Sequence, residues 1–317
     1  MRRLDRRSLT VAADEILSFA RIRNENLRLP RWLDNQRKLG VHRFFIVDNR
    51  SVDGSTEYLL EQDDVHLFWT DESFAANRSG MNWINCLLNE HGCDHWTLTT
   101  DADELLIYPE YERVNLVRLT AFLARSGADA LQCVLLDMHS DCAIKDTRYV
   151  RGSDFLERCP YFDREPPRDH RGGLRGRLFW NKEIGDPKLF WNEQTSRLIP
   201  SPYLGKVPLV RWSAGLSYAA STHFIRGLTP SSVSGALLHF KMFSDFAEKV
   251  RDAVEEKQYW NNSAEYAIYK ASLDADPNQT AFGAHSERFR DSAQLAELGF
   301  ISSSPDYDQF VASTVPN

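Results

Sequence analysis

The chain has 317 residues, and its 38 Lys and Arg against 45 Asp and Glu give a formal net charge of −7. Hydrophobic residues make up 42% and aromatic residues 12% of the chain, a composition that excludes intrinsic disorder and fibrous repeats. The acidic balance provides no basic face, so no nucleic-acid partner is expected. A negatively charged substrate therefore needs local positive charge, from a metal ion or from a few placed Arg and Lys side chains.

Cysteine usage and hydropathy bear on the compartment. The five cysteines are an odd number with no CxxC pair, so neither a disulfide framework nor a structural zinc site is expected. The sequence contains no run of about 18 apolar residues, so no membrane-spanning helix is expected. A signal peptide needs an apolar segment near the N-terminus, and here Asp14 and Glu15 interrupt that segment. We expect a cytoplasmic protein. Residues 1–14 are predicted to be a basic, solvated tail, which leaves peripheral contact with the inner face of a membrane open.

Strand-like and helix-like segments alternate over the first half of the chain. Short apolar runs predict strands at residues 16–22, 44–47, 65–69, 96–99 and 130–136. Apolar residues at helical spacing predict helices at residues 29–39, 55–61, 81–88 and 116–123. This alternation is typical of an α/β fold with a mostly parallel central sheet and helices on both faces.

The second half of the chain is less regular. Residues 141–221 are rich in Pro, Gly, Arg and aromatic residues, which predicts an ordered loop region. A helical pattern returns at residues 243–273, and a short helix at 293–298 precedes a loose tail. We therefore predict one domain over residues 15–240, with a nucleotide half (15–136) and an acceptor half (137–240), followed by a helical extension (241–317).

Asp101 and Asp103 directly follow the predicted strand at residues 96–99. Two carboxylates separated by one residue on an extended turn point the same way, so they can share a divalent cation with oxygens of a ligand. Such oxygen sites suit Mg²⁺ or Mn²⁺, which often complete their coordination with substrate phosphates. The plainer alternative is an acidic, solvated turn. The strand in front and the α/β pattern around it favour the metal site.

Polar residues also follow two other predicted strands, at 23–25 and 48–53. Ligands bind outside the carboxyl ends of parallel strands, so these residues are candidates for contact with a nucleoside. Asp48 can read the hydrogen-bonding edge of a base or ribose, whereas Asp53 fits helix capping equally well. Among the basic residues of the second half, Arg177 or Lys206 can clamp a diphosphate. A solvated loop is the alternative for each of them.

The ordered motifs resemble the family 2-like glycosyltransferases of GT-A fold, in particular a bacterial branch with a DxD motif. The resemblance rests on Arg-Asn-Glu at 23–25, Trp-Leu at 32–33, Leu-Gly-Val at 39–41, the polar run at 48–54 and Asp-Ala-Asp-Glu at 101–104. It covers residues 15–135 and extends more weakly to 205–212 and 237–241. It implies a GT-A type sheet with an irregular acceptor-side region and C-terminal helices.

The resemblance also implies an activity. A hexosyltransferase-type enzyme of this kind moves a sugar from a UDP- or GDP-linked donor to a hydroxyl of a glycan or lipid-linked glycan acceptor. The setting it implies is polysaccharide biosynthesis for the bacterial surface, with Mn²⁺ or Mg²⁺ as cofactor.

The resemblance implies roles for individual residues. Asp101 would face the ribose and the metal, and Asp103 would be the principal metal ligand. A late His often joins the metal ligands in this family. His239 is preferred over His223, because it follows a short apolar run as a strand-end residue would. The nucleotide-sugar contacts it implies, together with the clamp considered above, are Asn24, Glu25, Asp48, Arg78, Asp101 and Lys206.

The general base is the open point. Family 2 enzymes generally invert the anomeric centre with the help of a carboxylate base, but no Glu-Asp pair follows residue 104. The candidates left open are Asp137, Asp141, Glu157, Asp163, Glu165, Asp169 and Glu193. The absence of a recognisable base motif is also compatible with a protein that binds nucleotides or glycans without catalysis. A phosphohydrolase or nucleotidyltransferase with the same DxD is disfavoured, since Leu105 stands where a DxDxT phosphatase has Thr.

Overall fold

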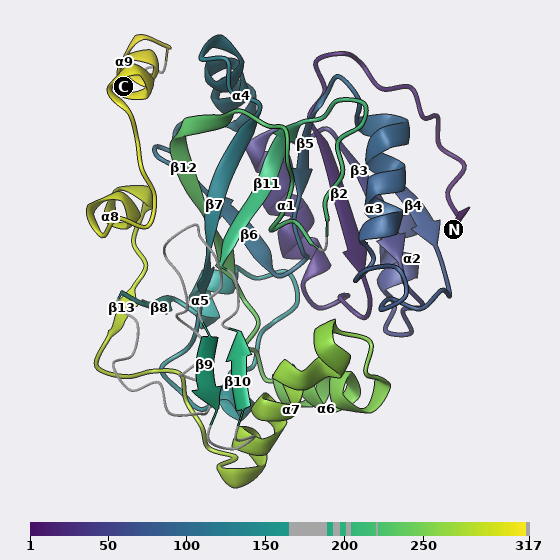
Figure 1. Cartoon of the computed structure of the whole chain (residues 1–317), viewed down its shortest axis with the longest axis vertical. Helices are drawn as coiled ribbons and strands as arrows, with labels where there is room; N and C mark the ends of the chain where they lie inside the picture. The colour runs from purple at the N-terminus through teal and green to yellow at the C-terminus, as the bar shows by residue number, and fades with distance from the viewer. Residues whose placement is uncertain (165–188, 193–196, 201–203, 220, 315–317) are drawn as a thin grey trace.

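The computed structural model of the chain describes residues 1–164, 189–192, 197–200, 204–219 and 221–314. Its centre is a nine-stranded sheet in the order β1-β4-β3-β2-β5-β11-β7-β12-β6 (Figure 1). The strands of this sheet are β1 (Arg2–Arg3), β2 (Leu17–Ile22), β3 (Arg43–Asp48), β4 (Val65–Trp69), β5 (Trp96–Thr99), β6 (Glu104–Ile107), β7 (Ala130–Asp137), β11 (Gly205–Arg211) and β12 (Pro230–His239).

Most strands of this sheet run in one direction. β2 pairs in parallel with β3 and β5, β3 with β4, and β7 with β12. β11 lies antiparallel between β5 and β7, which gives those two strands the same direction. Six of the nine strands are therefore parallel in direction, and β1, β6 and β11 run against them. The predicted α/β class with a mostly parallel sheet is confirmed.

Helices cover both faces of the sheet. Alternate residues of β3 show this, because successive side chains of a strand point to opposite faces. Phe44 and Ile46 pack in the core that includes α1 (Leu29–Leu39), α2 (Ser55–Leu60) and α4 (Leu116–Arg125). Phe45 and Val47 pack in the core that includes α3 (Met81–Leu87). Burial on both faces explains why these strands are continuous apolar runs.

The chain beyond β7 contains short elements before it returns to the sheet. They are a 3₁₀ turn (Ile144–Asp146), α5 (Phe155–Arg158), β8 (Tyr161–Asp163), β9 (Leu189–Asn192) and β10 (Arg197–Pro200). The elements after β12 are α6 (Phe246–Glu256), α7 (Trp260–Ala275), β13 (Ser286–Arg288), α8 (Ser292–Glu297) and α9 (Pro305–Thr314). Figure 1 shows α6 and α7 side by side below the sheet, and α8 and α9 along its left edge.

Two predictions about the ends of the chain are wrong. Residues 1–14 are not a solvated tail: β1 pairs with β4, and the buried Asp5 carboxylate accepts a hydrogen bond from the Leu67 N–H at 2.8 Å. The predicted loose tail contains α9, whose Tyr307 is fully buried with its ring centroid 5.0 Å from that of Phe122. In the described residues, no helix is long and apolar enough to cross a membrane.

The start of α4 offers a test of the helix boundaries. The side chain of Asn115 accepts a hydrogen bond from the Arg118 N–H at 3.1 Å. Replacing Asn115 by Ala leaves this N–H without its partner and should lower the free energy of unfolding by about 1 kcal/mol, measured by urea denaturation. Asn115→Asp keeps an acceptor oxygen and should stay close to the wild type. Equal losses in both variants would contradict the capping role.

Candidate functional site

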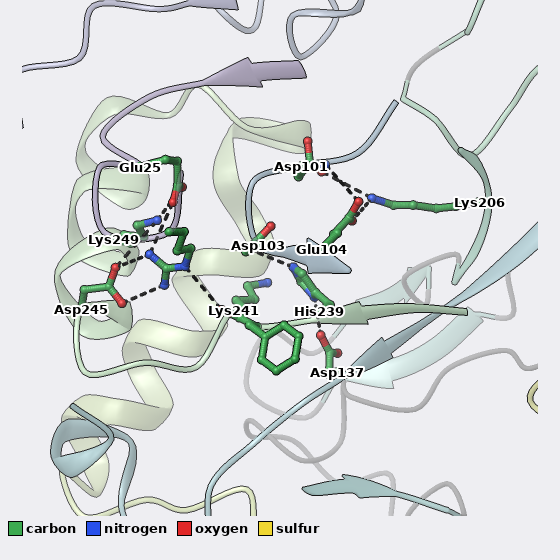
Figure 2. Close-up of polar contacts among 12 residues, drawn as sticks. Glu25, Asp101, Asp103, Glu104, Asp137, Lys206, His239, Lys241, Asp245 and Lys249 are labelled. Carbon is green, nitrogen blue, oxygen red and sulfur yellow. Dashed lines mark hydrogen bonds and ion pairs between the residues drawn. The ribbon is translucent and has the colours of Figure 1, made fainter. Parts of the chain in front are cut away.

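A pocket of about 360 Å³ opens at the carboxyl ends of the parallel strands. Its walls come from the segments that follow β2, β3, β5 and β12, from Lys206 on β11, and from α6 and α7. This is the edge of the sheet at which the sequence predicts a ligand. Figure 2 shows the polar side chains that meet there.

Strand pairing brings three of these side chains together. In the parallel β7–β12 pair, His239 lies opposite Asp137, and in the antiparallel β6–β12 pair it lies opposite Glu104. Asp103 directly precedes Glu104, and its carbonyl accepts the Phe240 N–H at 2.7 Å. As a result, the His239 ring contacts Asp137 through Nδ1, and its Nε2 is 3.3 Å from the Asp103 carboxylate (Figure 2).

The two carboxylates set the charge of this histidine. Burial favours the neutral ring, but Asp103 and Asp137 outweigh it and raise the pKa of His239 to about 10. Burial also disfavours the charged form of Asp103, yet the positive charge of His239 holds the pKa of Asp103 well below its usual range. At neutral pH the pair is therefore an imidazolium beside a carboxylate.

Because of His239, the protein should lose stability as the pH rises above neutrality. Its folded pKa of about 10 lies above the ordinary value of about 6.5. The imidazolium therefore stabilises the folded state fully below about pH 6.5, and this contribution is lost as the pH rises to about 10. Denaturant unfolding across this range should show a flatter pH dependence for His239→Gln. An unchanged slope in that variant would contradict the assignment.

Asp101 has different partners. Its Oδ1 is 3.0 Å from the guanidinium of Arg21 on β2, and its Oδ2 is 3.4 Å from the ammonium of Lys206. Burial opposes its ionisation, but these two cations outweigh it and lower the pKa of Asp101. Lys206 is also bonded to Glu104, whose pKa burial raises. Figure 2 shows Lys206 reaching both carboxylates.

The turn that carries the two aspartates is held from several sides. The Asp101 N–H donates to the Glu104 carboxylate at 3.0 Å, so this buried side chain fixes the turn from within. Residue Thr100, just before the turn, accepts hydrogen bonds from Trp32 and Gln36 of α1, both at 3.0 Å. The acidic turn is therefore a rigid part of the fold and not a solvated loop.

Two helices outside the predicted nucleotide half close the pocket. From α6, Lys249 pairs with Glu25 at 2.5 Å. Asp245, just before this helix, binds the fully buried Arg28 through two bonds of 2.6 and 2.9 Å. At the end of α6, Glu256 pairs with Arg23. The strand-end segment at 23–28 is thus fastened to α6 by three ion pairs.

Lys241 brings a further cation into the pocket, and the sequence analysis missed it. Its ammonium lies 4.6 Å from the ring centroid of Tyr269 and 5.2 Å from that of Tyr266. Burial disfavours the charge, but Tyr269, Glu265 and Asp137 outweigh it and raise the pKa of Lys241 above its ordinary value. Arg21 and Glu265 also line the pocket and were not predicted. The one sequence feature that could have pointed to any of the three is Arg21, an isolated charge within an apolar strand.

Three residues that were predicted to contact the nucleotide sugar do not line the pocket. Asp48 is fully buried, and its carboxylate accepts bonds from the Ser51 N–H and the Thr56 hydroxyl, so it holds its own loop instead of a ligand. The Asn24 side chain likewise accepts from the Val52 N–H, and Asn24 does not line the pocket. Arg78 is exposed and donates to Asn82 and to the carbonyl of Ala219, also outside the lining.

Glu25, Asp101, Asp103, Lys206, His223 and His239 do line the pocket. His223 contacts the Gly205 carbonyl through Nδ1 at 2.6 Å. Burial, reinforced by the charge of Lys206, lowers the pKa of His223 to about 4, so its ring is neutral. Of the two histidines considered for a metal, His239 is the one beside Asp103.

Asp103 and His239 lie at a spacing that suits two ligands of one divalent cation, and His239 would have to give up its Nε2 proton to bind that cation. Neighbouring ligands of an octahedral Mg²⁺ or Mn²⁺ lie about 3 Å apart, since metal–ligand bonds are about 2.0–2.1 Å, and these two groups are 3.3 Å apart. Asp137 would hold the other ring nitrogen, as carboxylates do behind metal-binding histidines. No group of three or more His, Cys, Asp or Glu in the described residues forms a complete site. To become a metal ligand, Asp101 would have to give up its ion pairs with Arg21 and Lys206.

Of the general-base candidates from the sequence, none that is described lines the pocket. Asp137 is committed to His239, Asp163 is buried, and Asp141 and Glu157 are exposed elsewhere. Glu165, Asp169, Glu193 and also Arg177 lie outside the described residues.

A scan of protein-family models gives no match for this chain, and neither does a search of curated proteins. Among solved structures, a 4-diphosphocytidyl-2C-methyl-D-erythritol synthase matches at 12% identity and a TM-score of 0.26, over 40% of this chain and 62% of that one, less than two thirds of its length. A protein described as a glucose-1-phosphate thymidylyltransferase from Bacillus anthracis, solved with sucrose, matches at 9% identity and a TM-score of 0.24, over 93% of this chain and 98% of that one. Likeness at this level carries no activity over to this chain.

Proposed function

We propose that the chain is a metal-dependent glycosyltransferase of GT-A type, which moves a sugar from a UDP- or GDP-linked donor to the hydroxyl of a glycan or lipid-linked glycan. One observation carries the proposal. In a chain of net charge −7, Arg21, Lys206, Lys241 and Lys249 gather around Asp101 and Asp103 in a single pocket. Cations around a pair of strand-end carboxylates suit a diphosphate that is held both directly and through a metal ion.

We assign a separate role in this reaction to each group of pocket residues. Asp103 and His239 would hold Mn²⁺ or Mg²⁺, with Asp137 orienting the ring. When bound, the cation neutralises negative charge on the diphosphate leaving group. Lys206 and Arg21 fix Asp101 at distances of 3.4 and 3.0 Å, and their remaining donors would bind phosphate oxygens. Glu25 stays with Lys249 at the side where we expect the nucleoside.

A thermal-shift series with UDP, GDP and their sugars, with and without Mn²⁺, tests this function. A ligand at a hundredfold excess over its dissociation constant stabilises the folded state by about 2.7 kcal/mol. We expect a shift for one nucleoside diphosphate that requires the metal. No shift with any of these nucleotides would refute the proposal.

The products separate this function from the others that share the pocket. A glycosyltransferase releases a nucleoside diphosphate from its donor, whereas a nucleotidyltransferase releases pyrophosphate from a nucleoside triphosphate and a phosphohydrolase releases phosphate. Nucleotide binding with no product at all would indicate a binding module.

A further inference from the structure

Two tyrosines from the α6–α7 region line the pocket with their rings side by side. Tyr259 directly precedes α7 and Tyr266 lies within it, and their ring centroids are 4.7 Å apart. The ring centroid of Tyr266 is also 6.0 Å from that of Tyr269 and 5.2 Å from the ammonium of Lys241. These contacts fix the position of the Tyr266 ring and do not involve its hydroxyl.

The hydroxyl of Tyr266 is not used by the fold. Tyr269, three residues further along α7, donates its own hydroxyl to Glu265. For Tyr266, which is half-buried, no hydrogen bond to the hydroxyl is made by any residue that the structure describes. A phenol can donate one hydrogen bond, and a tyrosine hydroxyl removed from bulk water usually finds a partner. An uncommitted hydroxyl at the wall of a pocket therefore suits a bound ligand.

The charges near this hydroxyl show which part of the pocket it faces. Burial raises the pKa of Tyr266 well above its ordinary value of about 10, and nearby negative charges, those of Asp103 and Asp101 among them, raise it further. Both aspartates line the same pocket from the acidic turn. The hydroxyl of Tyr266 therefore faces that turn and keeps its proton there.

Tyr259 lies nearer the other end of the pocket. Burial raises the pKa of Tyr259 to about 12, and the carboxylate that acts most strongly on it is Glu25, followed by the guanidinium of Arg23. Both belong to the segment at 23–28, on the side where we expect the nucleoside. Along this wall, Tyr259 is therefore on the nucleoside side, and Tyr266 is on the side of the acidic turn, where the diphosphate would end.

We infer that the Tyr266 hydroxyl donates a hydrogen bond to the distal phosphate of the nucleoside diphosphate, an inference that rests on the proposed function. A bound phosphate adds negative charge, which disfavours the phenolate still more, so the hydroxyl remains a donor. A hydrogen bond to an ionised oxygen is stronger than one to a neutral acceptor. Since the distal phosphate carries the bond to the sugar, this hydrogen bond also stabilises the charge that develops on the leaving group.

Nucleoside monophosphates and diphosphates test the inference, because only the diphosphates carry the distal phosphate. Tyr266→Phe keeps the ring and removes the hydroxyl alone. With Mn²⁺ present, we expect its UDP or GDP dissociation constant to rise about 10- to 100-fold, and its UMP or GMP dissociation constant to equal that of the wild type. Titration calorimetry measures these constants. Tyr58→Phe is the matched control, because Tyr58 is also half-buried but does not line the pocket.

The pattern of losses shows where the hydroxyl acts. Equal weakening of UMP and UDP binding, or of GMP and GDP binding, would place it on the nucleoside side and overturn the inference. Unchanged UDP and GDP binding in Tyr266→Phe, with or without weaker binding of UDP-glucose, would also overturn it. Each of these results leaves the proposed function standing. Absence of UDP and GDP binding in the wild type would overturn both.

Discussion

Replacing Asp103 by asparagine should abolish the metal-dependent part of nucleotide binding and slow sugar transfer about 10²- to 10³-fold. The substitution keeps the shape of the side chain but removes the carboxylate that faces His239 at 3.3 Å. Without it, the pair that fits a divalent cation is reduced to one ligand, and the diphosphate loses the charge that offsets its own. Titration calorimetry of UDP and GDP, with Mn²⁺ and with a chelator, measures the effect.

A matched variant shows whether the loss belongs to this position. Asp94 is exposed, has a φ of +67° that asparagine readily adopts, and does not line the pocket. Asp94→Asn should bind nucleotide and metal as the wild type does. If Asp103→Asn retains the full dependence on Mn²⁺, the metal role of Asp103 is refuted, whatever happens to the rate.

The elements that the sequence predicted well are those whose pattern is local. β2 to β5 are short apolar runs buried on both faces, and α1 ends at Leu39, just before Gly40, whose φ of +98° suits glycine. β6 was missed because it is four residues long, follows the acidic turn directly, and pairs with β12 far along the chain. β1 was missed for the same kind of reason, since two arginines form a strand only through their pairing with β4.

The residues of the site also differ in how far a local pattern reveals them. Asp101, Asp103 and His239 were predicted because each follows or ends a buried strand, and the end of such a strand can be recognised in the sequence. The same reasoning also pointed to Asp48, but no sequence pattern shows that Ser51 of the following loop and Thr56 of α2 satisfy that carboxylate. Lys241 and Glu265 could not be predicted, because their places depend on how α6 and α7 fold back over the pocket.

The buried pair of Lys206 and Glu104 should be the most costly interaction of the site to break by one substitution. The two side chains are 5% and 1% exposed. Lys206→Met fills a similar volume but leaves the Glu104 carboxylate without a cation, which should lower the free energy of unfolding by about 3–5 kcal/mol. Denaturant midpoints measure this loss. Lys249→Met, which breaks the more exposed pair with Glu25, should cost no more than about 1 kcal/mol.

A second substitution and a change of pH test the cause of that loss. Glu104→Gln added to Lys206→Met removes the stranded charge but keeps an oxygen for the Asp101 N–H, so part of the stability should return. Burial already raises the pKa of Glu104 in the wild type, and loss of Lys206 should raise it further. The loss of unfolding free energy in Lys206→Met should therefore be smallest at acidic pH, where Glu104 is protonated in the folded and the unfolded state of both proteins. It should grow as the pH rises from the folded-state pKa of Glu104 in the wild type towards the higher one in the variant. A deficit that does not change with pH would mean that lost packing, and not the unpaired carboxylate, causes the instability.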